Sequence, residues 1–264
     1  MREDHNILRA RDAIAAFIGS CDRLVIFTGA GISTEAGVPD FRSPGSPWLT
    51  HKPVPFQDYM ASAEARIEAW RRKFAMDDIY RHFGPGATHH FIAEGVGCGQ
   101  VSAVVTQNID NLHQRSGIAD DKIIELHGNG SFARCMECER RHEIPAIRTH
   151  FDHYGYPPVC DDCGGIVKSA TISFGQKMPT EALRRARDAM IRADGVIVLG
   201  SSLVVRPAAD LPLMAREAGA RLLIVNREKT PLDSAAECVI RGDLPQVLPK
   251  FWPLTDINAS SISR

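Results

Sequence analysis

Two Cys-x-x-Cys pairs are the strongest chemical signal in the sequence. The first pair is Cys135 and Cys138, and the second, after a gap of 21 residues, is Cys160 and Cys163. Two such pairs at about this separation are typical of a tetrahedral zinc site with four thiolate ligands. Because sulfur would fill all four positions, no position is left for water, and we expect a structural ion. The alternative is a set of free or redox-active thiols.

A glycine-rich segment follows the first strongly apolar run. Residues 24–27 are β-branched and aromatic, which is typical of a strand buried on both faces. Gly29 and Gly31 then allow a tight turn and a close approach to a ligand, with N–H groups presented to an anion. A helix opened by Ser33 or Thr34 should come next. The pattern predicts a phosphate-binding loop, and the alternative is a glycine turn without a ligand.

This loop differs from that of a nicotinamide dehydrogenase. The dehydrogenase pattern Gly-x-Gly-x-x-Gly needs a third glycine, and Thr34 occupies that position here. A segment rich in proline and glycine, residues 39–55, stands where a second strand should be. The sequence therefore disfavours a plain hydride-transfer enzyme.

Polar residues follow two further apolar runs, at the points where buried strands would end. Asn108 and Asp110 come after the run 101–106. His127 ends the short run 123–126. Open α/β sheets bind ligands at the carboxyl ends of parallel strands, and an imidazole with a pKa of about 6.5 is a natural general base. The alternatives are a helix cap for the first group and a structural or solvated role for the histidine.

Composition and charge limit the class of protein. The chain has 264 residues, of which 44% are apolar and 24% charged, and can form one large domain with a small module. A net charge of -1 disfavours a dedicated nucleic-acid binder. No apolar run approaches the roughly 20 residues that span a bilayer, so we predict a soluble protein. An odd total of seven cysteines with metal spacing, and no secretory signal, indicates a reducing compartment, the cytoplasm.

Strand and helix patterns alternate along the chain. Amphipathic or helical patterns are predicted over 1–20, 56–74 and 181–194, and further buried strands over 195–200 and 221–225. This alternation predicts an α/β protein with an open, mostly parallel, Rossmann-like sheet and helices on both faces, plus a small zinc module built on the four paired cysteines.

The motifs, in their order, resemble those of the sirtuin family of NAD-dependent protein deacylases. The family's motifs match Gly-Ala-Gly-Ile-Ser (29–33), Pro-Asp-Phe-Arg (39–42), Gln-Asn-Ile-Asp (107–110) and Leu-His-Gly (126–128). The family's Val-Phe-Phe-Gly-Glu segment is matched in part, by Ile172, Phe174 and Gly175, and the cysteine pairs lie between residue 128 and this segment. The resemblance covers roughly residues 20 to 250. It implies a Rossmann-like NAD-binding domain over 1–130 and 179–264, with residues 43–85 as cofactor loop and helices, and a zinc-binding module over 131–178.

The resemblance also assigns roles to residues. His127, Asn108 and Asp110 would be catalytic. Besides the last two, the cofactor-binding residues would be Gly29, Ala30, Gly31, Asp40, Phe41, Arg42, Gln107, Ile109, Gly200, Ser201, Ser202, Asn226, Gly242, Asp243 and Leu244. An acylated peptide would pair as an added strand and contact Ile172, Phe174, Gly175 and Val204. Zinc would be held by Cys135, Cys138, Cys160 and Cys163.

The reaction that the resemblance implies needs no side-chain nucleophile, and no Ser-His-Asp arrangement is evident in the sequence. The acyl-lysine oxygen attacks C1′ of the nicotinamide ribose as nicotinamide leaves. Asn108, Asp110 and Phe41 would lie near the departing ring, and His127 would then deprotonate the ribose hydroxyls. The products would be nicotinamide, lysine and O-acyl-ADP-ribose. The expected partners are acylated lysines of proteins or peptides, with neither a membrane nor a nucleic acid involved.

Two departures from the family pattern leave the acyl and peptide preferences open. Ser173 and Gln176 replace residues of the common Val-Phe-Phe-Gly-Glu segment. The branch that removes malonyl and succinyl groups carries a Tyr-x-x-Arg pair. Arg71 aligns with its arginine, but Glu68 stands in place of the tyrosine and would repel an acidic acyl group.

Two other functions stay open from the sequence. One is a mono-ADP-ribosyltransferase or NAD hydrolase on the same fold. The other is a non-catalytic zinc ribbon that binds NAD or nucleic acid. Basic residues between the cysteine pairs suggest the second of these: Arg140, Arg141, His142, Arg148 and His150.

Overall fold

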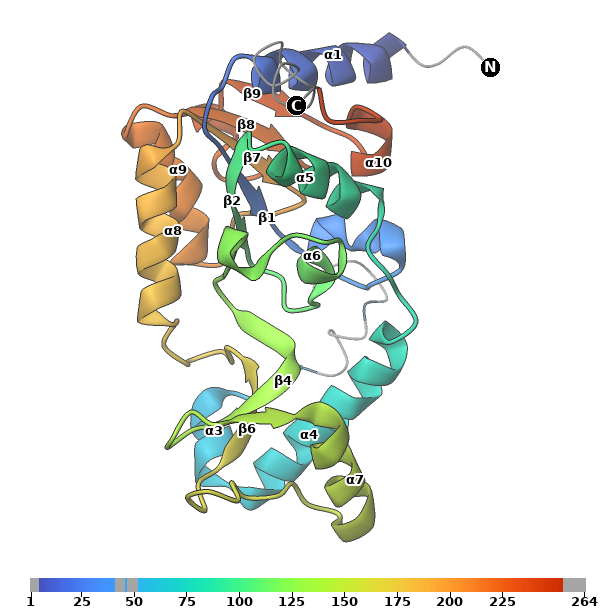
Figure 1. Cartoon of the computed structure of the whole chain (residues 1–264), viewed down its shortest axis with the longest axis vertical. Helices are drawn as coiled ribbons and strands as arrows, with labels where there is room; N and C mark the ends of the chain where they lie inside the picture. The colour runs from blue at the N-terminus through green and yellow to red at the C-terminus, as the bar shows by residue number, and fades with distance from the viewer. Residues whose placement is uncertain (1–4, 41–45, 47–51, 254–264) are drawn as a thin grey trace, which may run out of the picture.

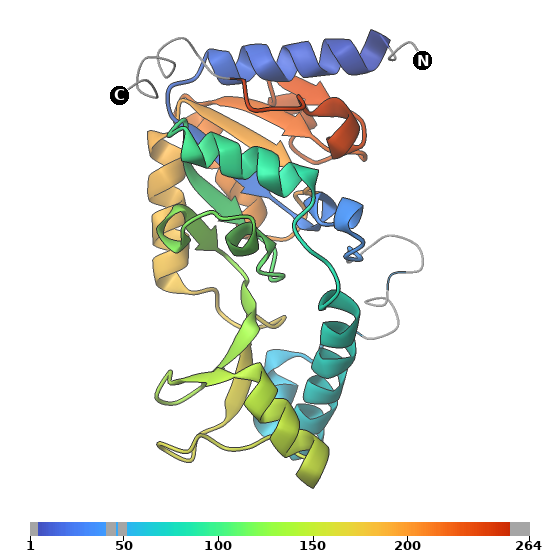
Figure 2. The ribbon, with the colours of Figure 1, turned by 45° about the vertical axis from the view of Figure 1, so that its right-hand side comes forward.

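Two β-sheets organise the computed structural model, which describes residues 5–40, 46 and 52–253. A large lobe contains a six-stranded sheet, and a small lobe contains a three-stranded sheet. The small lobe, with helices α4 (Ala63–Tyr80) and α7 (Ile144–Tyr154), lies at one end of the long axis of the molecule (Figures 1 and 2).

The large sheet is parallel throughout. Its strands run in the order β3 (Ile123–Glu125), β2 (Val101–Thr106), β1 (Leu24–Thr28), β7 (Gly195–Leu199), β8 (Arg221–Val225) and β9 (Cys238–Ile240). All five strand pairings are parallel. The predicted open α/β sheet is confirmed. The strand order reverses at β1 and β7, and such a reversal opens a crevice at the carboxyl ends of the strands.

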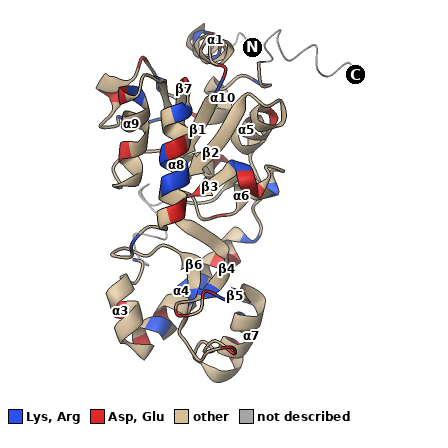
Figure 3. Cartoon of the chain, turned by 60° about the vertical axis from the view of Figure 1, so that its left-hand side comes forward, with Lys and Arg blue, Asp and Glu red and all other residues tan. Residues whose placement is uncertain are grey.

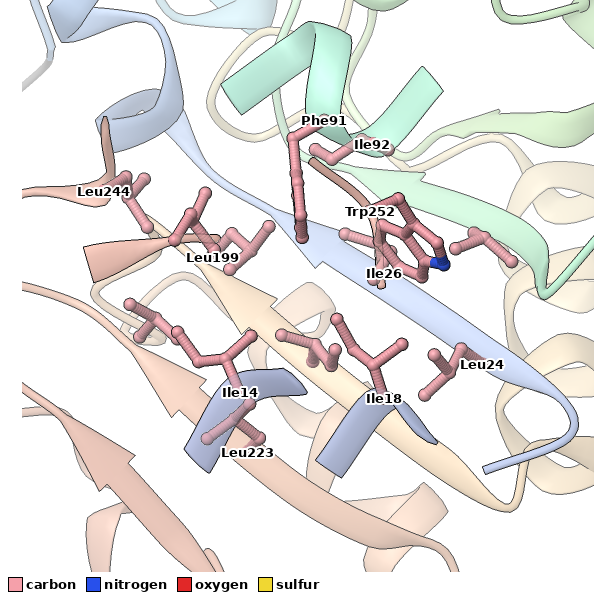
Figure 4. Packing of buried hydrophobic residues seen from close by; sticks show 14 of the residues in the cluster. Ile14, Ile18, Leu24, Ile26, Phe91, Ile92, Leu199, Leu223, Leu244 and Trp252 are labelled. Atoms are coloured by element: carbon pink, nitrogen blue, oxygen red, sulfur yellow. The ribbon is translucent and has the colours of Figure 1, made fainter. Parts of the chain in front are cut away.

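Helices cover both faces of this sheet, because alternate residues of the buried strands point to opposite sides. On one face, α1 (His5–Gly19), α5 (Ala87–Gly97) and α10 (Leu244–Val247) pack against strand residues such as Leu24 and Leu223. Figure 4 shows Ile14 and Ile18 of α1 over these strands. On the other face, α8 (Thr180–Arg192) and α9 (Leu211–Glu217) pack against neighbours such as Val25.

The small lobe has its own apolar core. Its antiparallel strands are β5 (Arg141–Glu143), β4 (Gly128–Cys135) and β6 (Val167–Thr171). Trp70 and Phe74 of α4 pack with Ile147 of α7 and with Val167. Helix α4 thus adds side chains to the core of the lobe that carries the four cysteines. The exact division of the chain into domains stays a prediction.

One helical prediction is confirmed as two helices instead of one, and another was wrong. The pattern over 56–74 forms two helices, α3 (Phe56–Ala61) and α4, because Ser62 adopts an extended conformation and its side chain caps α4 through the N–H of Ala65. The helix expected after β1 is replaced by two short 3₁₀ turns, η1 (Ala30–Ile32) and η2 (Thr34–Ala36), and Gly37 ends the second with a φ of 90°.

Short helical elements complete the described chain: α6 (Leu112–Arg115), η3 (Asp120–Lys122), η4 (Ala208–Asp210) and η5 (Asp233–Ala235). Among the described residues, no helix has the length and apolar character needed to cross a membrane.

Candidate active site

A cavity of about 1250 Å³ lies at the carboxyl ends of the central strands and extends to the chain after β6. It brings together most of the residues that the sequence predicted for cofactor and peptide. Those in its lining are Ala30, Gly31, Asp40, Gln107, Asn108, Ile109, His127, Ile172, Phe174, Gly175, Gly200, Ser202, Asn226, Gly242, Asp243 and Leu244. Residues far apart in the sequence therefore share one site, as expected for an open α/β sheet.

Other predicted residues lie outside this lining. Gly29 and Ser201 do not line it, although the Ser201 hydroxyl donates to Oε1 of the lining residue Gln107 at 3.0 Å. Asp110 lines a second, smaller cavity. Val204 is half exposed and lines neither cavity. Phe41 and Arg42 lie outside the described residues.

Gly29 and Gly31, which follow β1, allow their loop to pack closely against the loop that follows β7. The N–H of Gly31 donates to the carbonyl oxygen of Gly200 at 2.9 Å, and that of Gly29 donates to Leu199 at 3.1 Å. A Cβ atom at Gly29 or Gly31 would lie within 2.8 Å of the chain at Gly200 and Ser201. Because both N–H groups already bond to the neighbouring loop, other N–H groups of the turn would have to meet an anion, and the phosphate-binding role of the loop stays a prediction.

His127 is held in the cavity wall by the loop after β2. Its Nδ1 is 3.0 Å from the carbonyl oxygen of Gln107. Because a carbonyl oxygen can only accept, Nδ1 carries the proton and Nε2 is left as the basic nitrogen. Burial lowers the pKa of His127, although the bond to Gln107 opposes that change. The ring is therefore a neutral base at pH 7.

Two buried amide atoms beside His127 have no hydrogen-bond partner within the described part of the chain. They are Nε2 of Gln107, a donor, and Oδ1 of Asn108, an acceptor. Buried polar atoms are normally paired, so each is suited to a ligand. A ribose hydroxyl and a carboxamide N–H, both present in NAD, are partners of the required kinds.

The far end of the cavity is formed by the loops after β8 and β9. Asn226 lines it, and its side-chain amide donates to the carbonyl oxygen of Glu228 at 2.9 Å. Arg227 lies 3.7 Å from the carboxylate of Asp243. The sequence did not reveal Arg227, Glu228 or Arg206 as lining residues. Arg206 lies in the segment 201–207 that resembles the family's loop for the adenosine half of NAD, whereas Arg227 and Glu228 belong to no motif and reach the cavity through the packing of the loops.

Comparison with known proteins agrees with this geometry. The model of the Sir2 family matches residues 29–207, which is more than half of the chain. The chain belongs to this family. The resemblance to sirtuins predicted from the motifs is confirmed.

Sirtuins of known name and structure align over nearly the whole chain. An NAD-dependent protein deacetylase of Rhodopseudomonas palustris is 48% identical over 91% of this chain and 95% of its own length. NAD-dependent protein deacylase 2 of Pyrobaculum aerophilum is 37% identical over 90% and 93%. A solved Sir2 structure with a p53 peptide and NAD+ has a TM-score of 0.79, with 35% identity over 89% and 93% of the two chains.

The four predicted zinc ligands of this sirtuin form one cluster in the small lobe. Their sulfur atoms all lie within 4.8 Å of one another. Cys135 and Cys163 are 3.5 Å apart, and Cys138 and Cys160 are 3.7 Å apart, measured between sulfurs. A tetrahedral zinc ion with bonds of about 2.3 Å to sulfur holds its ligands about 3.8 Å apart. A disulfide would need about 2.05 Å, so the cluster fits a metal and not a disulfide.

Most of the basic residues between the cysteine pairs are matched by carboxylates. Arg140 lies 3.3 Å from Asp162, and Arg148 makes two bonds to Asp78 at 2.7 and 2.8 Å. Arg141 forms an ion pair with Glu143 at 2.7 Å. On the large lobe, acidic and basic residues alternate along α8 (Figure 3). These pairs weaken the case for a zinc ribbon that binds nucleic acid, since that function needs unmatched positive charge.

The two residues that align with the acidic-acyl specificity pair lie outside both cavities. Arg71 is exposed and forms an ion pair with Glu68 at 2.7 Å on the outside of α4. Neither residue lines either cavity. The carboxylate of Glu68 therefore cannot exclude acidic acyl chains, contrary to the expectation from the alignment.

Proposed function

We propose that this protein is an NAD-dependent protein-lysine deacylase, which transfers the acyl group of a modified lysine to ADP-ribose and releases nicotinamide. The observation that carries the proposal is the arrangement of His127 with Gln107 and Asn108. A neutral imidazole with a basic Nε2 shares the cavity wall with one unpaired donor and one unpaired acceptor, as judged over the described residues. The names of its relatives, deacetylases and a deacylase, support the same activity.

Each group in the wall has a definite task in this reaction. When bound, NAD supplies an electrophilic ribose carbon with nicotinamide as its leaving group. Oδ1 of Asn108 accepts a hydrogen bond from the carboxamide end, and Nε2 of Gln107 donates to the ribose. Nε2 of His127 takes a proton from a ribose hydroxyl. The other predicted residues that line the two cavities, including Asp110, Ile172 and Phe174, keep their proposed roles.

Mass spectrometry of the products tests this proposal. Purified protein is incubated with NAD and peptides that carry acetyl-lysine or longer or acidic acyl-lysines. Loss of the acyl group with equal formation of O-acyl-ADP-ribose is expected. Consumption of NAD without deacylation, or addition of ADP-ribose to protein, would replace the proposal with a hydrolase or a transferase.

The activity should persist to lower pH than an ordinary histidine would allow. The base acts only when neutral, and burial lowers the pKa of His127 below its usual value of about 6.5. The rate should therefore fall only as the pH drops through this lowered pKa. A plot of kcat/KM against pH should show its acid-side midpoint below about 6.5. A midpoint above that value would contradict the assignment of the base.

A second cavity of about 440 Å³ adjoins the first and bears on the choice of acyl group. The two cavities share lining residues, among them Ile109 and Thr171. The lining of the second cavity includes apolar side chains of α3 and α4, such as Tyr59, Trp70 and Met76, together with charged residues such as Lys73 and Asp77. Since each buried CH₂ contributes about 0.8 kcal/mol, we propose that acyl chains longer than acetyl extend into this space.

Filling this second cavity should select against long acyl groups. Ala69 of α4 lines it, and Ala69→Phe is expected to raise KM for butyryl and longer acyl peptides while acetyl peptides react as before. Ala63→Phe, at an exposed position of the same helix, is the matched control. If Ala69→Phe affects all acyl lengths equally, the acyl chain does not enter this cavity.

Zinc is the metal that we propose for the four cysteines, in a structural role. A tetrahedral cluster of four thiolates is the donor set that Zn²⁺ prefers. For location we propose a reducing compartment such as the cytoplasm. The seven cysteines are all free thiols, as metal binding by four of them requires.

A further inference from the structure

A row of buried polar side chains links α6 to the backbone of Asn108. Nε2 of His113 is 2.9 Å from Oγ1 of Thr28. The Thr28 hydroxyl donates to Oγ1 of Thr106 at 2.8 Å. That same oxygen accepts a bond of 3.0 Å from the N–H of Asn108. His113, Thr28 and Thr106 are at most 2% exposed, and none of them lines either cavity.

A second set of bonds holds the side chain of Asn108. Its Nδ2 donates to Oγ of Ser33 at 3.2 Å, and the Ser33 hydroxyl donates to Oδ2 of Asp110 at 2.7 Å. Oδ1 of Asp110 accepts from the N–H of Leu112 at 3.0 Å. Leu112 is the first residue of α6, the helix that carries His113. The two sets of bonds therefore form a closed ring through α6.

This ring leaves the side-chain oxygen of Asn108 for a ligand. The backbone N–H and the side-chain Nδ2 are both bonded within the ring, whereas Oδ1 is buried and meets no donor among the residues that the structure describes. A buried network in which the neighbouring groups are paired fixes the orientation of such an atom. Losing a member would leave its neighbours buried and unpaired, which is costly.

We propose that His113 and Thr28 are positioning residues for the reaction, which act through Thr106 to hold Asn108 so that its Oδ1 meets the nicotinamide end of NAD. The inference rests on the proposed function. Neither side chain touches the ligand. Burial lowers the pKa of His113 to about 3, with a contribution from His89, so the ring stays neutral at the pH of the assays.

Binding of NAD and of ADP-ribose, measured by calorimetry on the whole chain, tests the inference without catalysis. Thr28→Val keeps the shape of the side chain but removes the hydroxyl. We expect the Kd for NAD to rise about tenfold, the effect of one unpaired buried polar group. The Kd for ADP-ribose, which has no nicotinamide, should stay unchanged. Thr88→Val is the matched control, since the Thr88 hydroxyl is also buried but bonds to none of the described residues.

A second pair of variants decides the question if Thr28→Val does not fold. His113→Leu removes the bond to Thr28, whereas the amide of His113→Gln can restore it. We expect the leucine variant to weaken NAD binding alone and the glutamine variant to recover most of it. Normal NAD binding by the leucine variant, or equal weakening of NAD and ADP-ribose, would overturn the inference.

Measuring both ligand binding and deacylation by the wild-type protein distinguishes failure of the proposed function from failure of the positioning role. Wild type that binds NAD but removes no acyl group would overturn the proposed function. Wild type that removes acyl groups, with a Thr28→Val variant that binds both ligands like the Thr88→Val control, would overturn only the positioning role.

Discussion

Replacing His127 with alanine is expected to abolish deacylation while NAD stays bound. A general base contributes about a hundredfold to ten-thousandfold to a rate, so kcat should fall by that order. Within the described structure the imidazole makes a single hydrogen bond, from Nδ1 to the carbonyl oxygen of Gln107. Its loss should leave the fold and the amide groups of Gln107 and Asn108 in place. Calorimetry with NAD and the rate of O-acyl-ADP-ribose formation measure the two effects.

Exchange of labelled nicotinamide separates the base from a binding residue. In the proposed reaction the acyl oxygen attacks the ribose before the base acts, so His127→Ala should still exchange nicotinamide into NAD when an acyl peptide is present. His90→Ala, at an exposed position of α5, is the matched control and should behave like wild type. Loss of NAD binding together with exchange, or full activity of His127→Ala, would remove His127 from the role of base.

The functional residues that could be predicted best from the sequence are those that lie together in short motifs. The cysteine pairs, the segment around Asn108 and the position of His127 are short motifs on or beside strands that the apolar runs predicted. Since the carboxyl ends of parallel strands meet at one edge of a sheet, the motifs at β1, β2 and β3 had to share a site. The large cavity contains them.

Other features depend on contacts between distant segments, which no short motif records. The glycines after β1 resembled an anion site, but they are required by the loop at Gly200, which packs so closely that a Cβ atom would not fit. The helical segment is interrupted at Ser62 because this residue caps α4 instead of continuing α3. In the sequence, Thr28 is only the last residue of an apolar strand. Its role in the hydrogen-bonded ring around Asn108 depends on its contacts with Thr106 and His113.

The same distinction explains why the acyl preference was not predictable. Arg71 and Glu68 could be aligned with a specificity pair, but the rotation of α4 decides which of its faces meets the cavity. That rotation is set by Trp70 and Phe74, which pack into the core of the small lobe. Arg71 and Glu68 therefore lie outside, and other residues of α4, both apolar and charged, line the second cavity.

Replacing Cys135 with serine is expected to release the metal and unfold the small lobe. Metal binding in four-thiolate modules contributes on the order of 10 kcal/mol, which is comparable to the whole stability of a domain of about 5–15 kcal/mol. Cys135 and Cys160 are also buried in the core with Trp70 and Phe74. Metal analysis should show loss of bound zinc, and tryptophan fluorescence should show exposure of Trp70.

Cys163→Ser separates the metal from the packing, because Cys163 is exposed whereas Cys135 is buried. If zinc holds the lobe together, both variants should lose metal and the ordered small lobe. If only Cys135→Ser unfolds, the effect is one of core packing and the metal is dispensable. Cys98→Ser, at the end of α5 in the large lobe, should keep metal and fold. Activity should fall with the metal, because β6 leads directly into residues 172–175 of the large cavity.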